Sequence, residues 1–501
     1  MRITGPDRRS LPARIRPAPD SSSTPIAGTF GLSVDPATLS WQEGRVRMGG
    51  SPLRLLRLPA RAVALVSGWD DGGRIGDNPA EQRLARRLVA SGAFHPRPGP
   101  ATFSPADVTV VIPVQNRPAA LEHLLRTLGG LARIVVDDGS IDAELNRKIA
   151  TQAGARFIAL PVNAGPSAAR NAGLVAAMTP LVAFVDSDCT PSEDWLVPLL
   201  GHFDDPLVAA VAPRVTSAPA TSANALSRYE AVRSSLDRGP REGTVRPQSR
   251  IPYVPSAALV VRRDVAADPF FDPTLRGGED VDLVWRLVEA GWVVRYVPTS
   301  TVAHQGPATA GSFFRRRSFY GTSAGPLARR HPASLAPLQT SVWTAAVWGL
   351  AAARRPILAS LTLGVSVLLL AHRLRGLIDQ PIRVALTIAG GGAVKSALPA
   401  LSGLTRAWSP ALVVGLFFRR TRRVAALALL APSIYDEMSN PGHLDPVRYT
   451  ALHVADDIAY GAGVWRGCAA ASTVRPLLPQ IVVRSRIWGQ ATLQSELGGT
   501  A

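Results

Sequence analysis

The feature that most constrains the fold is a regular alternation of β-branched and helical segments between residues 108 and 185. Apolar runs predict strands at residues 108–114, 134–136, 156–160 and 181–185. Leucines at helical spacing in residues 121–128 predict one of the helices between them. Continuous apolar strands that alternate with helices are typical of a mostly parallel sheet covered on both faces. The chain is therefore predicted to contain an α/β domain.

Carboxylates follow two of these predicted strands. Asp137 and Asp138 come after the second, and Asp186 and Asp188 come after the last. In open α/β sheets, ligands bind beyond the carboxyl ends of the strands. Side chains alternate along an extended backbone, so Asp186 and Asp188 point to the same side and can hold a divalent cation. Asp137 or Asp138 could accept a hydrogen bond from a base or ribose.

Each of these assignments has a simpler alternative. An isolated Asp-x-Asp is commonly a solvated turn, but two acidic strand ends in one sheet favour a binding site. Arg170 and Asn171, on the helix after Gly165-Pro166, could reach a phosphate or ribose. For Arg170 the alternative is a structural ion pair with one of the aspartates.

A third acidic group lies further along the chain. Glu279 and Asp280 follow a Gly-Gly turn and begin a predicted helix. Carboxylates stabilise a helix N-terminus for structural reasons, but one of these is also placed to act as a general base. His304 follows a predicted strand at residues 293–297. It is either a third metal ligand or an inert loop histidine.

The order and spacing of these motifs over residues 106–310 resemble the family 2 glycosyltransferases, which have the GT-A nucleotide-diphosphosugar transferase fold. The matching segments are Val-Ile-Pro-Val (111–114), Val-Asp-Asp-Gly-Ser (136–140), Asn163-x-Gly165, Ala169-Arg170-Asn171-x-Gly173, Asp186-Ser187-Asp188 and Gly278-Glu279-Asp280.

The resemblance implies a UDP-sugar donor site. Asp138, together with Asp137, would bind uracil and ribose, and Asn163 and Arg170 would complete the nucleotide-sugar site. Asp186 and Asp188 would hold the diphosphate through Mg²⁺ or Mn²⁺, with His304 as a further ligand as in some members of the family.

The resemblance also implies an inverting hexosyltransferase. Asp280 would deprotonate the acceptor hydroxyl, with Glu279 beside it, in a single displacement. The Gln-x-x-Arg-Trp motif of processive polysaccharide synthases is absent, which argues against a cellulose- or chitin-type enzyme. In its place is a segment with arginines at 315–317, which could neutralise the diphosphate, face lipid phosphate or be solvated.

Over its whole length the chain resembles the mycofactocin-system glycosyltransferases. The resemblance rests on Gly-Gly-Ser-Pro (49–52) in an N-terminal module, Arg-Ser-Phe-Tyr-Gly-Thr-Ser (317–323) and a hydrophobic C-terminal part. It implies repeated transfer of glucose from UDP-glucose, in β linkage, to a peptide-derived redox cofactor, premycofactocin. The alternative is a membrane glycosyltransferase acting on a cell-wall lipid or a lipid-linked saccharide.

Composition divides the chain into four regions. We predict a disordered tail (1–28), a small winged-helix-like module (29–98), the GT-A domain (106–325) and a hydrophobic helical region (340–480). The second region resembles peptide-recognition modules, although a packing or dimerisation role is equally compatible with it. Asp436, Glu437, His453, Asp456 and Asp457 in the last region are predicted to lie on a helix-bundle surface.

The net charge and the hydrophobic region indicate which ligands the protein binds and where in the cell it is located. A net charge of +18, carried almost entirely by arginine, favours phosphorylated ligands or an anionic membrane. Nucleic acid is not expected, because no zinc-finger spacing or RNA-binding signature is present. Two cysteines fit a reducing cytosol. Short apolar segments flanked by arginine predict helices on the cytoplasmic face of the cell membrane, while tilted spans or soluble core helices remain alternatives.

Overall fold

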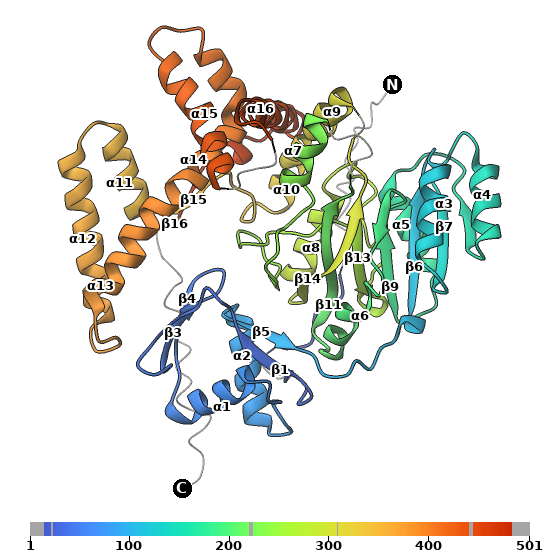
Figure 1. The fold of residues 1–501 in the computed structure, drawn as a ribbon, viewed down its shortest axis with the longest axis horizontal. Helices are drawn as coiled ribbons and strands as arrows, with labels where there is room; N and C mark the ends of the chain where they lie inside the picture. The colour runs from blue at the N-terminus through green and yellow to red at the C-terminus, as the bar shows by residue number, and fades with distance from the viewer. Residues whose placement is uncertain (1–14, 22–23, 220–223, 308, 440–443, 483–501) are drawn as a thin grey trace, which may run out of the picture.

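The computed structural model describes residues 15–21, 24–219, 224–307, 309–439 and 444–482. A small N-terminal module lies below a central sheet that carries helices, and further helices extend above and to the left of both (Figure 1). The architecture is α/β, as predicted.

The four strands predicted from residues 108–185 form one half of the central sheet. They pair in parallel in the order β9, β6, β7, β8. Their bounds are β6 (Val108–Val114), β7 (Ala132–Asp137), β8 (Arg156–Ala159) and β9 (Leu181–Val185).

The other half of the sheet is mixed. The strand β13 (Ala258–Arg262) is antiparallel to both β9 and β11 (Val208–Ser217). The strand β14 (Val293–His304) is parallel to β11, and it pairs with the antiparallel β10 (Cys189–Pro191) and β12 (Gly243–Thr244). The strand predicted at 293–297 therefore continues to His304, which lies on the strand itself.

Helices cover both faces of the sheet, because strand residues alternate between two cores. Val110 and Ile112 contribute to one core and Val111 to the other. Helices α3 (Pro118–Thr127), α4 (Ala143–Gln152) and α6 (Val197–Leu200) pack on the first core. Helices α5 (Pro166–Ala176) and α8 (Glu279–Glu289) pack on the second.

The N-terminal module has a hydrophobic core of its own. It contains two helices and two small sheets, one of β1 and β5 and one of β2, β3 and β4. The elements are β1 (Gly31–Val34), β2 (Leu39–Trp41), β3 (Val46–Gly49), β4 (Arg54–Arg57), α1 (Ala60–Asp70), α2 (Pro79–Ser91) and β5 (Phe94–Arg97). The winged-helix likeness stays a prediction.

Residues 15–21 differ from the disorder predicted for residues 1–28. The Ala18 N–H donates to the Ala290 carbonyl oxygen at 2.9 Å, and Trp292 Nε1 donates to the Arg16 carbonyl oxygen at 2.6 Å. These contacts hold the segment against the α/β domain. Residues 1–14 and 22–23 of the predicted tail lie outside the described residues.

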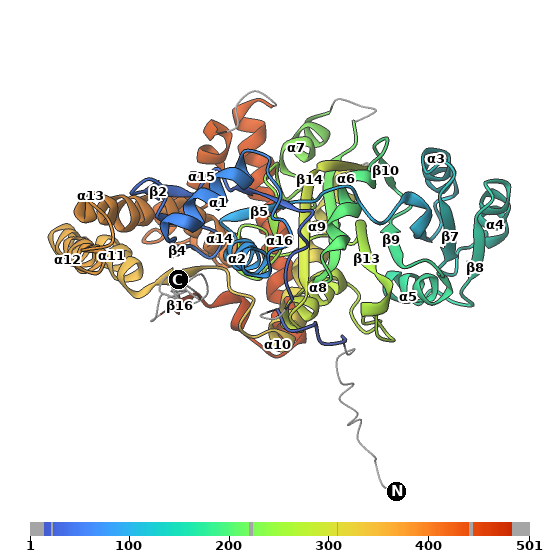
Figure 2. The ribbon, with the colours of Figure 1, turned by 90° about the horizontal axis from the view of Figure 1, so that it is seen from below.

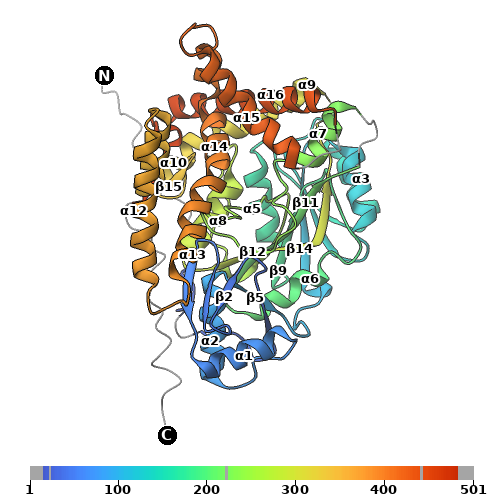
Figure 3. The same ribbon diagram turned by 60° about the vertical axis from the view of Figure 1, so that its left-hand side comes forward.

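The C-terminal third is helical, as predicted. Two of its helical segments, Pro356–Leu374 and Pro381–Gly415, are long and apolar enough to cross a membrane. Figures 2 and 3 show α12 (Pro356–Leu374) and α13 (Pro381–Ala385) beside the small module. The remaining elements are α7 (Ala225–Arg233), α9 (Ala310–Thr322), α10 (Ala324–Arg330), β15 (Gln339–Ser341), α11 (Val342–Ala352), α12 (Pro356–Leu374), α13 (Pro381–Ala385), α14 (Gly391–Gly415), α15 (Arg422–Ser439), α16 (Pro446–Ala470) and β16 (Gln480–Val482).

The prediction that the second acidic cluster lies on a helix-bundle surface is wrong for His453, Asp456 and Asp457. His453, Asp456 and Asp457 on α16 are 1–2% exposed. Asp456 accepts a hydrogen bond from the Tyr229 hydroxyl at 3.1 Å and lies 3.1 Å from Arg317 Nε. Buried carboxylates require such partners, and these come from α7 and α9, which the periodicity of α16 alone does not reveal.

Candidate active site

The carboxyl edge of the sheet opens into a cavity of about 1160 Å³ that brings most of the predicted site residues together. Its lining includes residues from β6, α5, α8, β14 and α9 and from the loops that follow β7 and β9. The predicted residues among them are Asp138, Arg170, Asp186, Asp188, Glu279, Asp280 and His304.

Two predicted nucleotide-binding residues do not line this cavity. Asp137 is fully buried and accepts hydrogen bonds from the Ser140 N–H at 2.8 Å and from Asn146 Nδ2 at 2.7 Å. Asn163 is exposed. Gly139, with φ +65°, brings the turn against Asn163, because a Cβ there would lie 2.5 Å from the Asn163 nitrogen. In this structure Asp137 therefore shapes the turn that presents Asp138.

Asp138 faces the cavity and links two loops. Its carboxylate accepts hydrogen bonds from the Ala164 N–H at 2.7 Å and from the Gly165 N–H at 2.9 Å. These donors lie just before α5, so the carboxylate fixes the start of that helix. A carboxylate has about four acceptor positions, and a ligand hydroxyl or amide can still bind.

Arg170 joins two acidic groups of the site. Its Nη2 donates to Asp186 Oδ1 at 2.7 Å, and its Nη1 donates to Glu279 Oε1 at 3.1 Å. The arginine is 3% exposed. The alternative of a structural ion pair thus describes this structure: Arg170 positions Asp186 and Glu279 relative to each other.

Asp188 and His304 come together because β10 pairs with the end of β14. The register places Cys189 opposite His304, so that His304 Nε2 lies 3.6 Å from Asp188 Oδ1. Burial alone would raise the pKa of Asp188, but His304, Arg117 and Arg316 lower it. Burial lowers the pKa of His304 and outweighs the opposing charge of Asp188, while Arg316 and Arg117 act in the same direction as burial. A carboxylate and an imidazole this close together are both suited to a divalent metal.

No group of three or more His, Cys, Asp or Glu side chains is placed to hold a metal ion in the part of the chain that the structure describes. This is compatible with Mg²⁺ or Mn²⁺ held jointly by one or two carboxylates and by substrate phosphates. Asp188 also accepts a hydrogen bond from Arg117 Nη1. The Arg117 side chain is 47% exposed and can move away when a cation binds.

Asp280 has the environment of a general base. Burial, and then the neighbouring Glu279, raises the pKa of Asp280 to about 7, although hydrogen bonds from Val281 and Ser256 and the charge of Arg170 oppose the rise. Its Oδ1 accepts the Val281 N–H at 2.8 Å at the start of α8. A carboxylate with a pKa near the working pH can take a proton from an acceptor hydroxyl and later release it.

Several residues that line the cavity were not predicted from the sequence. Arg117 follows β6 at the same carboxyl edge, where the strand-end rule could have found it. The predicted arginine run is divided between two cavities: Arg316 and Arg317 line this one, and Arg315 lines another. Arg317 is buried and donates to Glu230 Oε1 at 2.5 Å. Residues of the C-terminal helices, Arg406, Asp456 and Tyr460, also line the cavity, and nothing local in the sequence marks them.

Comparison with known proteins agrees with this geometry. Residues 109–268 match the family model "Glycosyl transferase family 2". The chain is 40% identical over 475 residues to the pre-mycofactocin glycosyltransferase of Mycobacterium tuberculosis, covering 92% of this chain and 99% of that protein. The chain belongs to glycosyltransferase family 2, in the group of the pre-mycofactocin glycosyltransferases.

Other similar proteins cover less than half of this chain. The glycosyltransferase AglE of Haloferax volcanii is 27% identical over 203 residues, which is 38% of this chain and 64% of that protein. Among solved structures, GalNAc-T7 with UDP, GalNAc and Mn²⁺ aligns with a TM-score of 0.31 at 16% identity, covering 44% of this chain and 51% of that one.

Proposed function

We propose that this family 2 glycosyltransferase is a metal-dependent, inverting hexosyltransferase that adds glucose from UDP-glucose, in β linkage and repeatedly, to premycofactocin. The observation that carries the proposal is the single cavity shared by Asp138, Asp186, Asp188, Asp280 and His304. The acceptor is suggested by the M. tuberculosis relative, which matches almost end to end.

In this proposal each residue has one task. Asp138 receives the nucleoside at the start of α5, held by two backbone N–H groups. Asp188, with Asp186 and His304, would hold Mg²⁺ or Mn²⁺ together with the diphosphate oxygens. When bound, the cation would supply positive charge that offsets the negative charge of the leaving nucleotide. Arg117 and Arg316 add positive charge at the same place.

Asp280 takes the proton from the acceptor hydroxyl as that oxygen attacks the anomeric carbon. The bond to the diphosphate breaks in the same displacement, and the anomeric configuration inverts. Glu279 and Arg170 act as positioning residues, since they contact Asp280 or Asp186 and hold the carboxylates in place.

The proposed setting is the cytoplasmic face of the cell membrane. This setting is supported by two long apolar helical segments, Pro356–Leu374 and Pro381–Gly415. Only 22% and 24%, respectively, of an 18-residue apolar stretch in these segments is buried within the protein. The same segments favour the second candidate function, transfer to a cell-wall lipid or lipid-linked saccharide. The N-terminal module would hold the acceptor's peptide-derived part.

A donor and acceptor screen tests the proposal. The full-length protein in detergent is incubated with premycofactocin or a lipid-linked acceptor, each UDP- or GDP-sugar in turn, and Mn²⁺, Mg²⁺ or excess chelator. Mass spectrometry should show successive hexose additions to premycofactocin with UDP-glucose and metal, and none with chelator. A β-glucosidase should remove the added sugars. Hexose transfer only to the lipid-linked acceptor would replace the proposal by the second candidate, and full activity in chelator would remove the metal.

A further inference from the structure

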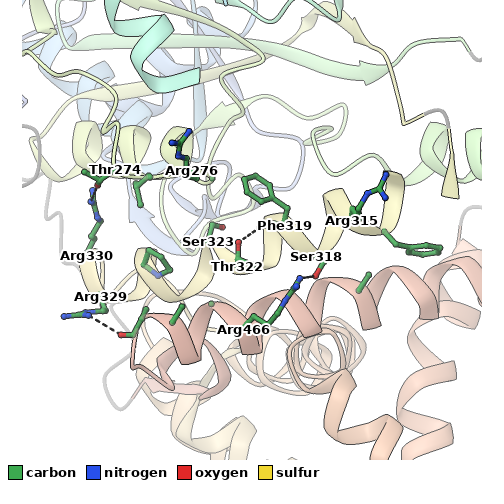
Figure 4. Close-up of a pocket in the computed structure, with 18 of the residues that line it drawn as sticks. Thr274, Arg276, Arg315, Ser318, Phe319, Thr322, Ser323, Arg329, Arg330 and Arg466 are labelled. Atoms are coloured by element: carbon green, nitrogen blue, oxygen red, sulfur yellow. Dashed lines mark hydrogen bonds between the residues drawn. The ribbon is translucent and has the colours of Figure 1, made fainter. Parts of the chain in front are cut away.

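A second large cavity, separate from the carboxylate site, lies on the other side of α9. Its volume is about 1380 Å³, and it is lined by the loop at residues 274–277, by α9 and α10, and by α16 (Figure 4). Arg276, Gly277, Phe319 and Ser323 line both cavities, so they form the wall between them. We name the second cavity the arginine groove.

Positive charge dominates the arginine groove. Its lining carries the guanidinium groups of five arginines and, among the described residues, no carboxylate. They are Arg276, Arg315, Arg329, Arg330 and Arg466. A cleft lined by one sign of charge focuses the field and concentrates ions of the opposite sign.

Within the described part of the chain, most of this charge has no counter-charge. Of the five arginines, Arg330 alone forms ion pairs there, with Asp272 at 2.6 Å and Asp282 at 3.4 Å. Arg466 donates to the Ser318 hydroxyl and Arg329 to the Ala471 carbonyl oxygen, and neither partner carries charge. No ion pair of the described residues involves Arg276 or Arg315, and both are exposed.

The rest of the lining combines hydroxyl and apolar side chains. The hydroxyl groups are those of Thr274, Ser318, Thr322 and Ser323, and the larger apolar side chains are those of Leu275, Phe314, Phe319 and Pro326. Figure 4 shows Arg276 on the loop and the other arginines on α9, α10 and α16, with Arg466 reaching Ser318. An extended groove with several guanidinium forks matches phosphate groups, which accept paired hydrogen bonds from arginine.

We propose that the arginine groove is a binding site for a phosphate-bearing ligand, distinct from the site that holds Asp186, Asp188 and Asp280. The shared chemistry is a phosphate group, which either a free phosphate compound or a phospholipid headgroup can supply. The ligand would lie against residues 274–277, which lead directly into Glu279 and Asp280.

Calorimetry with the full-length protein tests the site. The probes are inorganic phosphate and dihexanoyl phosphatidylglycerol, with dihexanoyl phosphatidylcholine as a lipid that has no net charge. The variants are Arg315→Gln/Arg466→Gln in the groove and, as a charge-matched control, Arg61→Gln/Arg126→Gln on the exposed surfaces of α1 and α3. Neither pair touches Asp186, Asp188 or Asp280.

At least one phosphate probe should bind the wild type and the control equally and the groove variant about tenfold or more weakly, since the variant loses two charged hydrogen-bond donors. Binding of inorganic phosphate would identify a free phosphate as the source, and binding of the phosphatidylglycerol alone would identify a headgroup. Equal binding by the groove and control variants, or no binding of either probe, would overturn the proposal. Because neither donor nor acceptor is present, this outcome is independent of the proposed transferase activity.

Discussion

At the scale of single residues, two aspartates on one helix show how environment assigns chemistry. Burial and Glu279 raise the pKa of Asp280 to about 7. For Asp282 burial would also raise the pKa, but a hydrogen bond from His331 and the charge of Arg286 lower it to about 2. Asp280 alone of the two can therefore accept and release a proton near neutral pH.

Replacing Asp280 by asparagine should lower kcat by about 10²–10⁴-fold, because proton transfer to a positioned base contributes this much. The KM for the donor should change by less than about threefold, since the amide keeps the shape of the side chain. Initial rates and UDP calorimetry measure both values. Asp142→Asn, at an exposed helix cap, is the matched control. Wild-type turnover in Asp280→Asn would exclude this residue as the base.

The pH dependence of turnover should follow the Asp280 carboxyl. The base is ionised above its pKa of about 7 and protonated below it. At saturating substrates, kcat should therefore rise with pH, level off above about 8 and fall about tenfold per unit below about 6. The residual rate of Asp280→Asn should lack this step. A wild-type profile that is flat between pH 5 and 8 would contradict the assignment.

At the scale of elements, the contact between α9, α10 and α16 depends on glycines that face each other. A Cβ at Gly321 on α9 would overlap the Tyr460 carbonyl oxygen of α16, and a Cβ at Gly463 on α16 would overlap the Ser318 carbonyl oxygen. The two backbones touch directly at these positions. This close contact explains why position 321, within the motif at residues 317–323, holds a glycine. It also keeps α16 in place beside both cavities.

Gly321→Ala should destabilise the protein by about 2 kcal/mol or more, because an extra methyl in a closely packed contact forces the backbones apart. Gly311→Ala is the control on the same helix: a Cβ there meets no atom within 4 Å. Its effect should be neutral or stabilising by up to about 1 kcal/mol, because alanine favours the helix. Chemical denaturation in detergent measures both. Equal stability of the two variants would contradict the close contact.

At the scale of the whole molecule, the N-terminal module and the C-terminal helical region meet at α12. The small module contributes Trp41, Val46 and Leu55 to a hydrophobic cluster that also contains residues of α12 and α13. Figure 3 shows β2 beside α13. The same module contacts the α/β domain through Arg86, whose Nη1 and Nη2 donate to the two carboxylate oxygens of Asp205 at 2.6 and 2.7 Å. Other residues of α12 stay exposed, including Leu361 at 60% and Leu368 at 63%.

This exposed side of α12 should bind membranes. In a flotation assay with phosphatidylglycerol-containing vesicles, Leu361→Asn/Leu368→Asn should reduce the bound fraction at least about tenfold, since each buried leucine contributes about 1.5–3 kcal/mol. Val175→Asn/Met178→Asn changes residues of similar exposure, 68% and 79%, on the far side of the α/β domain and should float like the wild type. Equal flotation of the two double variants would exclude α12 as the membrane contact.

The sequence by itself determined the strand and helix pattern of residues 108–185 and the acidic strand ends, because hydrophobic periodicity and turn residues act over short distances. It also determined the family, through motifs whose order is preserved along the chain. It did not reveal that β13 runs antiparallel in the sheet, that Asp137 turns away from the cavity, or that His453, Asp456 and Asp457 are buried. Only the tertiary structure decided these, because strand direction, burial and charge pairing depend on partners far apart in the sequence. The same contacts raise the pKa of Asp280 and gather five arginines around one groove.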